Sequence, residues 1–225
     1  ALPAQVNRLN ITMGYSGKNN PVQILISKLF KMHSTAMARN AKSYVFYYKD
    51  VIDVLTHPLI SDNAEAENLV KDIRRNNFTF IPHKTIISIH GEGNLLFQLL
   101  FAKWENGALE VIENLSSLLL SLKETLSADS TQEKLTKTFI YSIYKVLNKI
   151  SNYFSVHDSS NTIETLTSIY KQVIDLAEVS FEGEPLEGLQ LMGVLETRGL
   201  DFDTVIITSM NEGKFPAGKS QNSFI

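Results

Sequence analysis

The sequence predicts an α/β domain that is interrupted by a large, mostly helical insertion. Strand-like runs lie near both ends of the 225-residue chain, and apolar stripes at helical spacing occupy the region between them. One sheet-containing domain with a long insertion is the simplest arrangement that explains this order. We therefore expect three parts, residues 1–61, 62–180 and 181–225, of which the first and the last belong to one α/β domain.

The first part shows two strand patterns and two helix starts. Apolar and polar residues alternate over residues 6–13, and the run Tyr44–Tyr47 is rich in residue types favoured in strands. Asn20–Gln23 supplies an N-cap residue, a proline at the first helical position and a glutamine at the third, which together indicate a helix start. A second helix is expected after Tyr47 and ends before Pro58.

Three apolar stripes predict the core of the helical insertion. They run from Ala108 to Leu126, from Leu135 to Phe154 and from Leu166 to Leu176, with apolar residues recurring every three or four positions. Ser130–Glu133 is a capping box, and Asn161–Glu164 is a second helix start. We interpret these stripes as packed core rather than as a surface for a cofactor.

The pattern changes again near the end of the chain. Residues 189–194 and 204–208 are strand-like runs, and Gly199 lies in the expected turn between them. These runs supply the strands of the last part of the predicted α/β domain.

The composition excludes several kinds of site. The chain has no cysteine, so disulfides and cysteine-ligated metals are excluded, and its five histidines lack the spacing of a local metal motif. We expect no metal, no bound cofactor and no catalytic residue in this chain. No apolar run approaches the roughly 18 residues of a membrane span, which is compatible with a cytoplasmic location.

The charge pattern does not by itself indicate a partner. The net charge is −3, and the basic residues Lys71, Arg74 and Arg75 form a small cluster on an expected helix. We interpret this cluster as a solvated helix face, with contact to phosphate as the alternative. Because the chain begins at Ala1 and its last residues read as a loop, we interpret it as a segment of a longer polypeptide.

A literal match to the phosphate-loop pattern G-x-x-x-x-G-K-[ST] lies at Gly213–Ser220. A working phosphate loop is followed by a helix whose N-terminal amides bind the phosphate, whereas five residues follow Ser220. Pro216 also removes one backbone N–H from the loop. We therefore interpret the stretch as a surface loop. An autonomous phosphate-loop NTPase remains an alternative function, ranked third of three.

Two runs near the end of the chain carry a resemblance to a known family. Arg198–Val205 and Ile206–Pro216 resemble motif V and the following strand of UvrD/RecB-type superfamily 1 helicases. The family pattern there is a Lys-Gly-Leu-Glu-Phe-Asp turn, an apolar strand and an Asn/Glu-Glu-Gly-x-Phe-Pro loop. The aromatic pair and helix within Phe46–Leu55 are similar to the segment that leads into the family's helical insertion. The similarity is greatest to the AddB-like group, in which an often inactivated helicase is joined to a PD-(D/E)XK nuclease.

The resemblance implies a function in DNA repair and recombination. It implies a partial RecA-like (P-loop NTPase-type) domain, the second of a helicase/exonuclease-type protein, that contributes DNA binding rather than catalysis. Arg198, Gly199 and Leu200 would approach a DNA phosphodiester, because glycine permits close backbone contact and arginine adds a charged donor. The partners implied are DNA, as a single strand or a duplex end, and a nuclease or helicase subunit.

The chain departs from the family pattern at three positions. Gly193 stands where active enzymes have threonine, Leu195 where they have histidine, and Arg198 where they have lysine. ATP and Mg²⁺ are therefore implied for the parent protein only if its first RecA-like domain is active. The alternative reading from the residues is a helical protein–protein interaction module without a nucleic-acid role.

Overall fold

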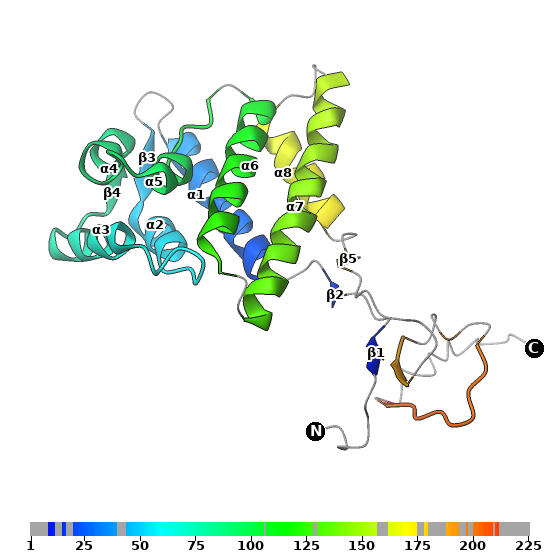
Figure 1. The fold of residues 1–225 in the computed structure, drawn as a ribbon. Coiled ribbons are helices and arrows are strands. Elements are labelled where there is room, and N and C mark those ends of the chain that lie inside the picture. The colour runs from blue at the N-terminus through cyan, green and yellow to red at the C-terminus, as the bar shows by residue number, and fades with distance from the viewer. Residues whose placement is uncertain are drawn as a thin grey trace, which may run out of the picture. The chain divides into compact units, whose positions relative to one another are not determined.

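The structure of the protein, a computed structural model, is predominantly helical over its described residues (Figure 1). The described residues are 9–11, 15–16, 20–39, 44–105, 107–127, 130–156, 162–174, 178–179, 188–193, 197, 200–208 and 210–211. Contacts divide the chain into two units, one formed by Gly14–Phe181 and the other by Ala1–Met13 with Glu182–Ile225. None of the described helices combines the length and the apolarity that a membrane crossing requires.

The Gly14–Phe181 unit contains all the described helices and two small antiparallel strand pairs. The helices are α1 (Pro21–Arg39), α2 (Tyr48–Leu55), α3 (Ala64–Arg75), α4 (His83–His90), α5 (Leu95–Leu100), α6 (Ala108–Thr125), α7 (Thr131–Val156) and α8 (Ile163–Ile174). One strand pair is β2 (Tyr15–Ser16) with β5 (Glu178–Val179), and the other is β3 (Val45–Tyr47) with β4 (Phe80–Pro82).

The helix starts predicted from local sequence are confirmed. Asn20 caps α1, because the Gln23 N–H donates to its Oδ1 at 2.9 Å, and Pro21 occupies the first helical position. The capping box at α7 is complete: the Glu133 N–H donates to Ser130 Oγ at 3.2 Å and the Ser130 N–H donates to Glu133 Oε2 at 3.3 Å. Thr162 caps α8 through its Oγ1, which accepts from the Thr165 N–H at 3.2 Å.

The predicted apolar stripes of α6 and α7 form part of the core of this unit. The third stripe is confirmed in part, because Leu166 is buried and Ile169 and Val173 are half-buried. Leu176 lies outside the described residues. Figure 1 shows α6, α7 and α8 side by side, and each of them packs against the other two. Their inward faces are buried at the following residues: Ala108, Ile112, Leu115, Leu119, Leu122, Phe139, Ile143, Val146, Ile150, Phe154 and Leu166. Burial of such faces is the main source of stability for helices of this kind.

The first boundary between units differs from the expected division at residue 61. α1 packs against β3, α2 and α7, and its buried face includes Val22, Leu25 and Leu29. A helix with so apolar a face needs a surface on which to bury it, and the helical middle of the chain supplies that surface. Residues 20–60 therefore belong to the same unit as the helices that follow them.

The second unit joins the two ends of the chain. β1 (Leu9–Ile11) pairs in parallel with β6 (Leu189–Leu191), with Leu9 opposite Leu189 and Ile11 opposite Leu191. Strands far apart in sequence thus lie next to each other, as the interrupted α/β arrangement requires. The chain is therefore a mixed structure of many helices and few, short strands.

The strand expected at residues 204–208 is not a strand in the structure. These residues are described and have no strand pairing, and Ile206 is 82% exposed. A strand is defined by hydrogen bonds to a neighbour, and a run of apolar residues cannot show from its own sequence whether a neighbour is present. The expectation was therefore wrong for this run.

Candidate nucleic-acid interface

The turn predicted to approach DNA lies mostly outside the described residues. Arg198 and Gly199 are not described, nor is the phosphate-loop match at Gly213–Ser220. Leu200 is described and is 42% exposed, and its N–H donates to the carbonyl oxygen of Thr197 at 3.2 Å. The contact of Arg198 and Gly199 with DNA therefore stays a prediction.

Histidine 33 is a buried structural residue. Its Nε2 lies 3.0 Å from the Leu100 carbonyl oxygen, which can only accept, so Nε2 carries the proton. Its Nδ1 then accepts from the Tyr44 hydroxyl at 2.7 Å, and this hydroxyl accepts from the Trp104 backbone N–H at 3.2 Å. The ring also stacks on the Trp104 indole at 4.1 Å between centroids. Both ring nitrogens are thus used within the core, which leaves none for a metal or a substrate.

Histidine 90 joins two helices rather than a ligand. Its Nδ1 lies 3.0 Å from Glu65 Oε2 and its Nε2 lies 3.4 Å from Asp72 Oδ2, so the last residue of α4 is held against α3. This bond lowers the pKa of the Glu65 carboxyl. The described residues contain no group of three or more histidine, aspartate or glutamate side chains placed to hold a metal ion.

A basic and aromatic surface runs along the solvent side of α7. We define the α7 outer face as Tyr141, Lys145, Lys149 and Tyr153, which follow one another at intervals of four residues. This spacing places side chains on one side of a helix. Tyr141 is 58% exposed and Tyr153 is 44% exposed, and both lysines are exposed. Lys145 Nζ lies 5.2 Å from the centroid of the Tyr141 ring, a distance typical of a cation–π contact.

The charged side chains of α7 beyond its first turn are all positive. Residues 134–156 contain four lysines and no acidic residue. The single acid of the helix, Glu133, is engaged at the N-terminus, where it accepts from the hydroxyls of Ser127 at 2.6 Å and Ser130 at 3.1 Å. The α7 outer face is therefore a local positive surface in a chain whose net charge is −3.

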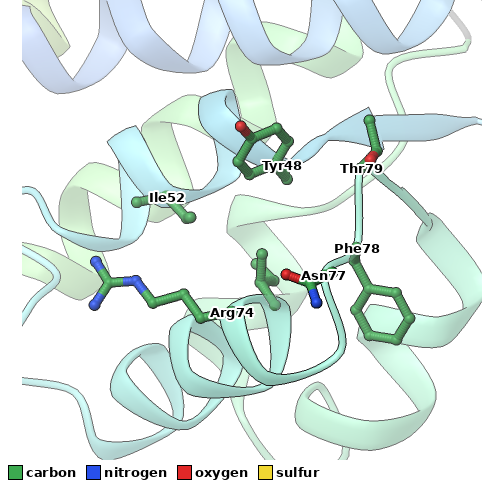
Figure 2. Close-up of a pocket in the computed structure, with 7 residues that line it drawn as sticks. Tyr48, Ile52, Arg74, Asn77, Phe78 and Thr79 are labelled. Atoms are coloured by element: carbon green, nitrogen blue, oxygen red, sulfur yellow. The ribbon is translucent and has the colours of Figure 1, made fainter.

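A groove lies between α2 and α3. Figure 2 shows Tyr48 and Ile52 on the α2 side, with Arg74 and Asn77 on the α3 side. Its volume is about 350 Å³, and Ile73, Phe78 and Thr79 complete its lining. The lining contains one cationic side chain and no carboxylate.

The end of α3 determines the shape of this groove. The Phe78 N–H donates to the Ile73 carbonyl at 3.1 Å and the Asn77 N–H to the Arg74 carbonyl at 3.4 Å, which is the Schellman arrangement of a helix C-terminus. Asn77 has φ of 50°, a left-handed conformation that asparagine tolerates. The motif turns the chain sharply and brings Phe78 next to the last turn of α3.

Comparison with known protein families, curated proteins and solved structures finds no match. The interpretation of these surfaces therefore depends on the residues themselves and on the resemblance at Arg198–Pro216. The three surfaces are the turn that ends at Leu200, the α7 outer face and the α2–α3 groove.

The sequence analysis singled out only part of these surfaces. It noted Arg74 as a member of a basic cluster and an aromatic pair within Phe46–Leu55, and the structure places Arg74 and Tyr48 in one groove. It did not single out the α7 outer face, although Tyr141, Lys145 and Lys149 lie on the side of the helix opposite the predicted stripe. The Asn76–Asn77 pair after two arginines is a helix-end signal that would have located the groove's closing turn.

Proposed function

We propose that the chain is a DNA-binding segment of a helicase/exonuclease-type protein of DNA repair and recombination, and that it contributes binding rather than catalysis. The observation that supports DNA binding most directly is the α7 outer face, where two exposed lysines lie between two exposed tyrosines. Cationic side chains attract the phosphate backbone, and aromatic rings stack with unpaired bases. Together these are the chemistry of a surface for single-stranded DNA.

The resemblance at Arg198–Pro216 supports the same class of function from a different part of the chain. In the proposed role, the backbone near Gly199 and Leu200 approaches a phosphodiester and Arg198 supplies a charged donor. Contacts of this kind position a strand without reading its bases, so binding is expected to be independent of sequence.

A second candidate function is a protein–protein interaction module. The observation that favours it is the apolar run near the end of the chain, where Val205, Ile207 and Met210 are all more than half exposed. Exposed apolar side chains in such a group are typical of a surface that another chain covers. This function does not account for the lysines of the α7 outer face.

Substitution of Arg198 tests the proposed contact at the turn. The full chain is titrated against fluorescently labelled single strands of several sequences at low salt, and binding is followed by fluorescence anisotropy. We expect weak binding that falls steeply with added salt, because the contacts are to phosphate. Arg198→Ala is expected to weaken binding to every sequence by the same factor. Unchanged binding would remove Arg198 from the interface, and no binding by the wild-type chain would favour the interaction module.

A further inference from the structure

We propose that the α2–α3 groove receives one unstacked base of a bound single strand and that Arg74 contacts the adjoining phosphate. This inference rests on the proposed DNA binding and assigns it a base-accepting site. It differs from the stacking and phosphate contacts proposed for the α7 outer face and from the phosphate contacts near Leu200, because those surfaces need no cavity.

The lining of the groove suits a flat, apolar ring with an anionic neighbour. Ile52 supplies an aliphatic surface over the buried Ile73, and Tyr48 supplies an aromatic one. Phe78 also lines the groove and is exposed at its edge. The volume of about 350 Å³ lies at the lower end of the range for small-ligand sites, which suits a base better than a larger group. Stacking on aromatic side chains tolerates any base, in agreement with binding that is independent of sequence.

Arg74 is available for a phosphate. Within the described part of the chain its guanidinium has no carboxylate at ion-pairing distance, whereas the neighbouring basic residue Lys71 is paired with Glu67 at 2.6 Å. Figure 2 shows the Arg74 and Phe78 side chains on opposite sides of Asn77, with the Phe78 ring turned away from Tyr48. The planar guanidinium presents several donors, a geometry that suits a bidentate contact with the phosphate next to the bound base.

The aromatic surface continues beyond the groove. Phe78 is 39% exposed, and Tyr48 packs edge-on against Tyr47, with ring centroids 5.0 Å apart. The centroid of the Tyr47 ring in turn lies 5.7 Å from that of the Phe80 ring on β4. Two exposed phenylalanines and two half-buried tyrosines cluster here around a cavity whose described lining contains one cation and no acid. The charge of the α2–α3 groove therefore favours an anionic nucleic-acid strand over a basic ligand.

The experiment compares two strands that carry the same phosphates. Labelled oligothymidylate and an abasic deoxyribose-phosphate strand of equal length are titrated against the full chain by fluorescence anisotropy. The wild-type chain is expected to bind oligothymidylate about fivefold more tightly or better, because stacking of one base is worth roughly 1–3 kcal/mol. Phe78→Ser is expected to remove part of this preference without changing the affinity for the abasic strand, and the tyrosines of the α7 outer face account for the remainder.

Arg74→Gln is expected to weaken the binding of both strands. The control is Arg75→Gln, because Arg75 is adjacent but lies outside the groove. This variant should lower the affinity for each strand only by the small amount that the loss of one distant charge causes. Circular dichroism of each variant confirms that the helices are retained. A strand that carries 4-thiothymidine, cross-linked to the wild-type chain by light, is expected to label the peptides containing Tyr48 or Phe78.

The outcomes distinguish this inference from the proposed function. Equal binding of the two strands by the wild-type chain, or cross-links confined to other helices, would overturn the groove as a base site while DNA binding stands. Failure of both strands to bind would overturn the proposed function, and the base site with it.

Discussion

Burial holds His33 neutral. The loss of hydration lowers the pKa of this histidine to about 3, and neither of its ring nitrogens is free to take a second proton. The pKa of His57 is lowered to about 4 and that of His83 is also lowered, in each case mainly by burial. The unfolded chain therefore binds more protons than the folded one between these values and about 6.5, the ordinary pKa of histidine.

Acid is expected to destabilise the fold through these groups. Because the folded-state pKa of His33 is depressed, its contribution to stability is complete above pH 6.5 and decreases as the pH falls toward 3. At pH 5 the expected loss from His33 alone is about 2 kcal/mol. Urea unfolding of the wild-type chain and of His33→Gln between pH 7 and pH 5 measures it. The variant is expected to be less stable at pH 7 and to lose less stability on acidification. An equal loss in both chains would show that His33 does not titrate on unfolding.

Helix α7 depends on its cap as well as on its core. The Ser130 hydroxyl accepts from the Glu133 N–H and the Glu133 carboxylate accepts from the Ser130 N–H, so two N-terminal donors of the helix are satisfied at once. Glu133 does not contribute to the α7 outer face, because its side chain is directed to Ser127 and Ser130. The negative charge of Glu133 therefore lies at the N-terminal end of α7, where it interacts favourably with the helix dipole.

Ser130→Ala is expected to lower the free energy of unfolding by about 1 kcal/mol, because it removes the N-cap acceptor. Chemical denaturation followed by circular dichroism measures the change. Ser155→Ala, an exposed serine near the other end of α7, is the matched control and should change stability by less than half as much. Equal effects of the two substitutions would contradict the role given to the cap.

The elements that were predictable from sequence are those fixed by neighbouring residues. The starts of α1, α7 and α8 follow from Asn20, Ser130 and Thr162, whose side chains bond to amides three residues along the chain. The run at residues 204–208 has the composition of a strand, yet strand formation depends on a partner that local sequence does not reveal. Local sequence could not predict the α2–α3 groove either, because the groove brings Tyr48 and Phe78 together through the packing of separate elements.

The division of the whole molecule was predictable in part. The two chain ends do pair, through β1 and β6, as the interrupted arrangement requires. Residues 20–60 instead pack with the helical middle, because the apolar faces of α1 and α2 are buried there. The net charge of −3, summed over the whole chain, also conceals the basic surface of α7, where four lysines and no acidic residue lie within residues 134–156.

The proposed function is the binding of single-stranded DNA through positive and aromatic surfaces, of which the α7 outer face is the best defined. Its most direct test is the affinity of the double variant Lys145→Gln/Lys149→Gln for labelled oligothymidylate across a range of salt concentrations. The matched control, Lys123→Gln/Lys171→Gln, removes two exposed lysines from α6 and α8 and the same total charge.

We expect the α7 variant to bind about tenfold more weakly at low salt. We also expect the slope of log affinity against log salt to fall by about 1.4, since each lost phosphate contact on a single strand removes about 0.7. The control should retain the wild-type slope. Wild-type affinity and slope in the α7 variant, or the same loss in both variants, would contradict the claim.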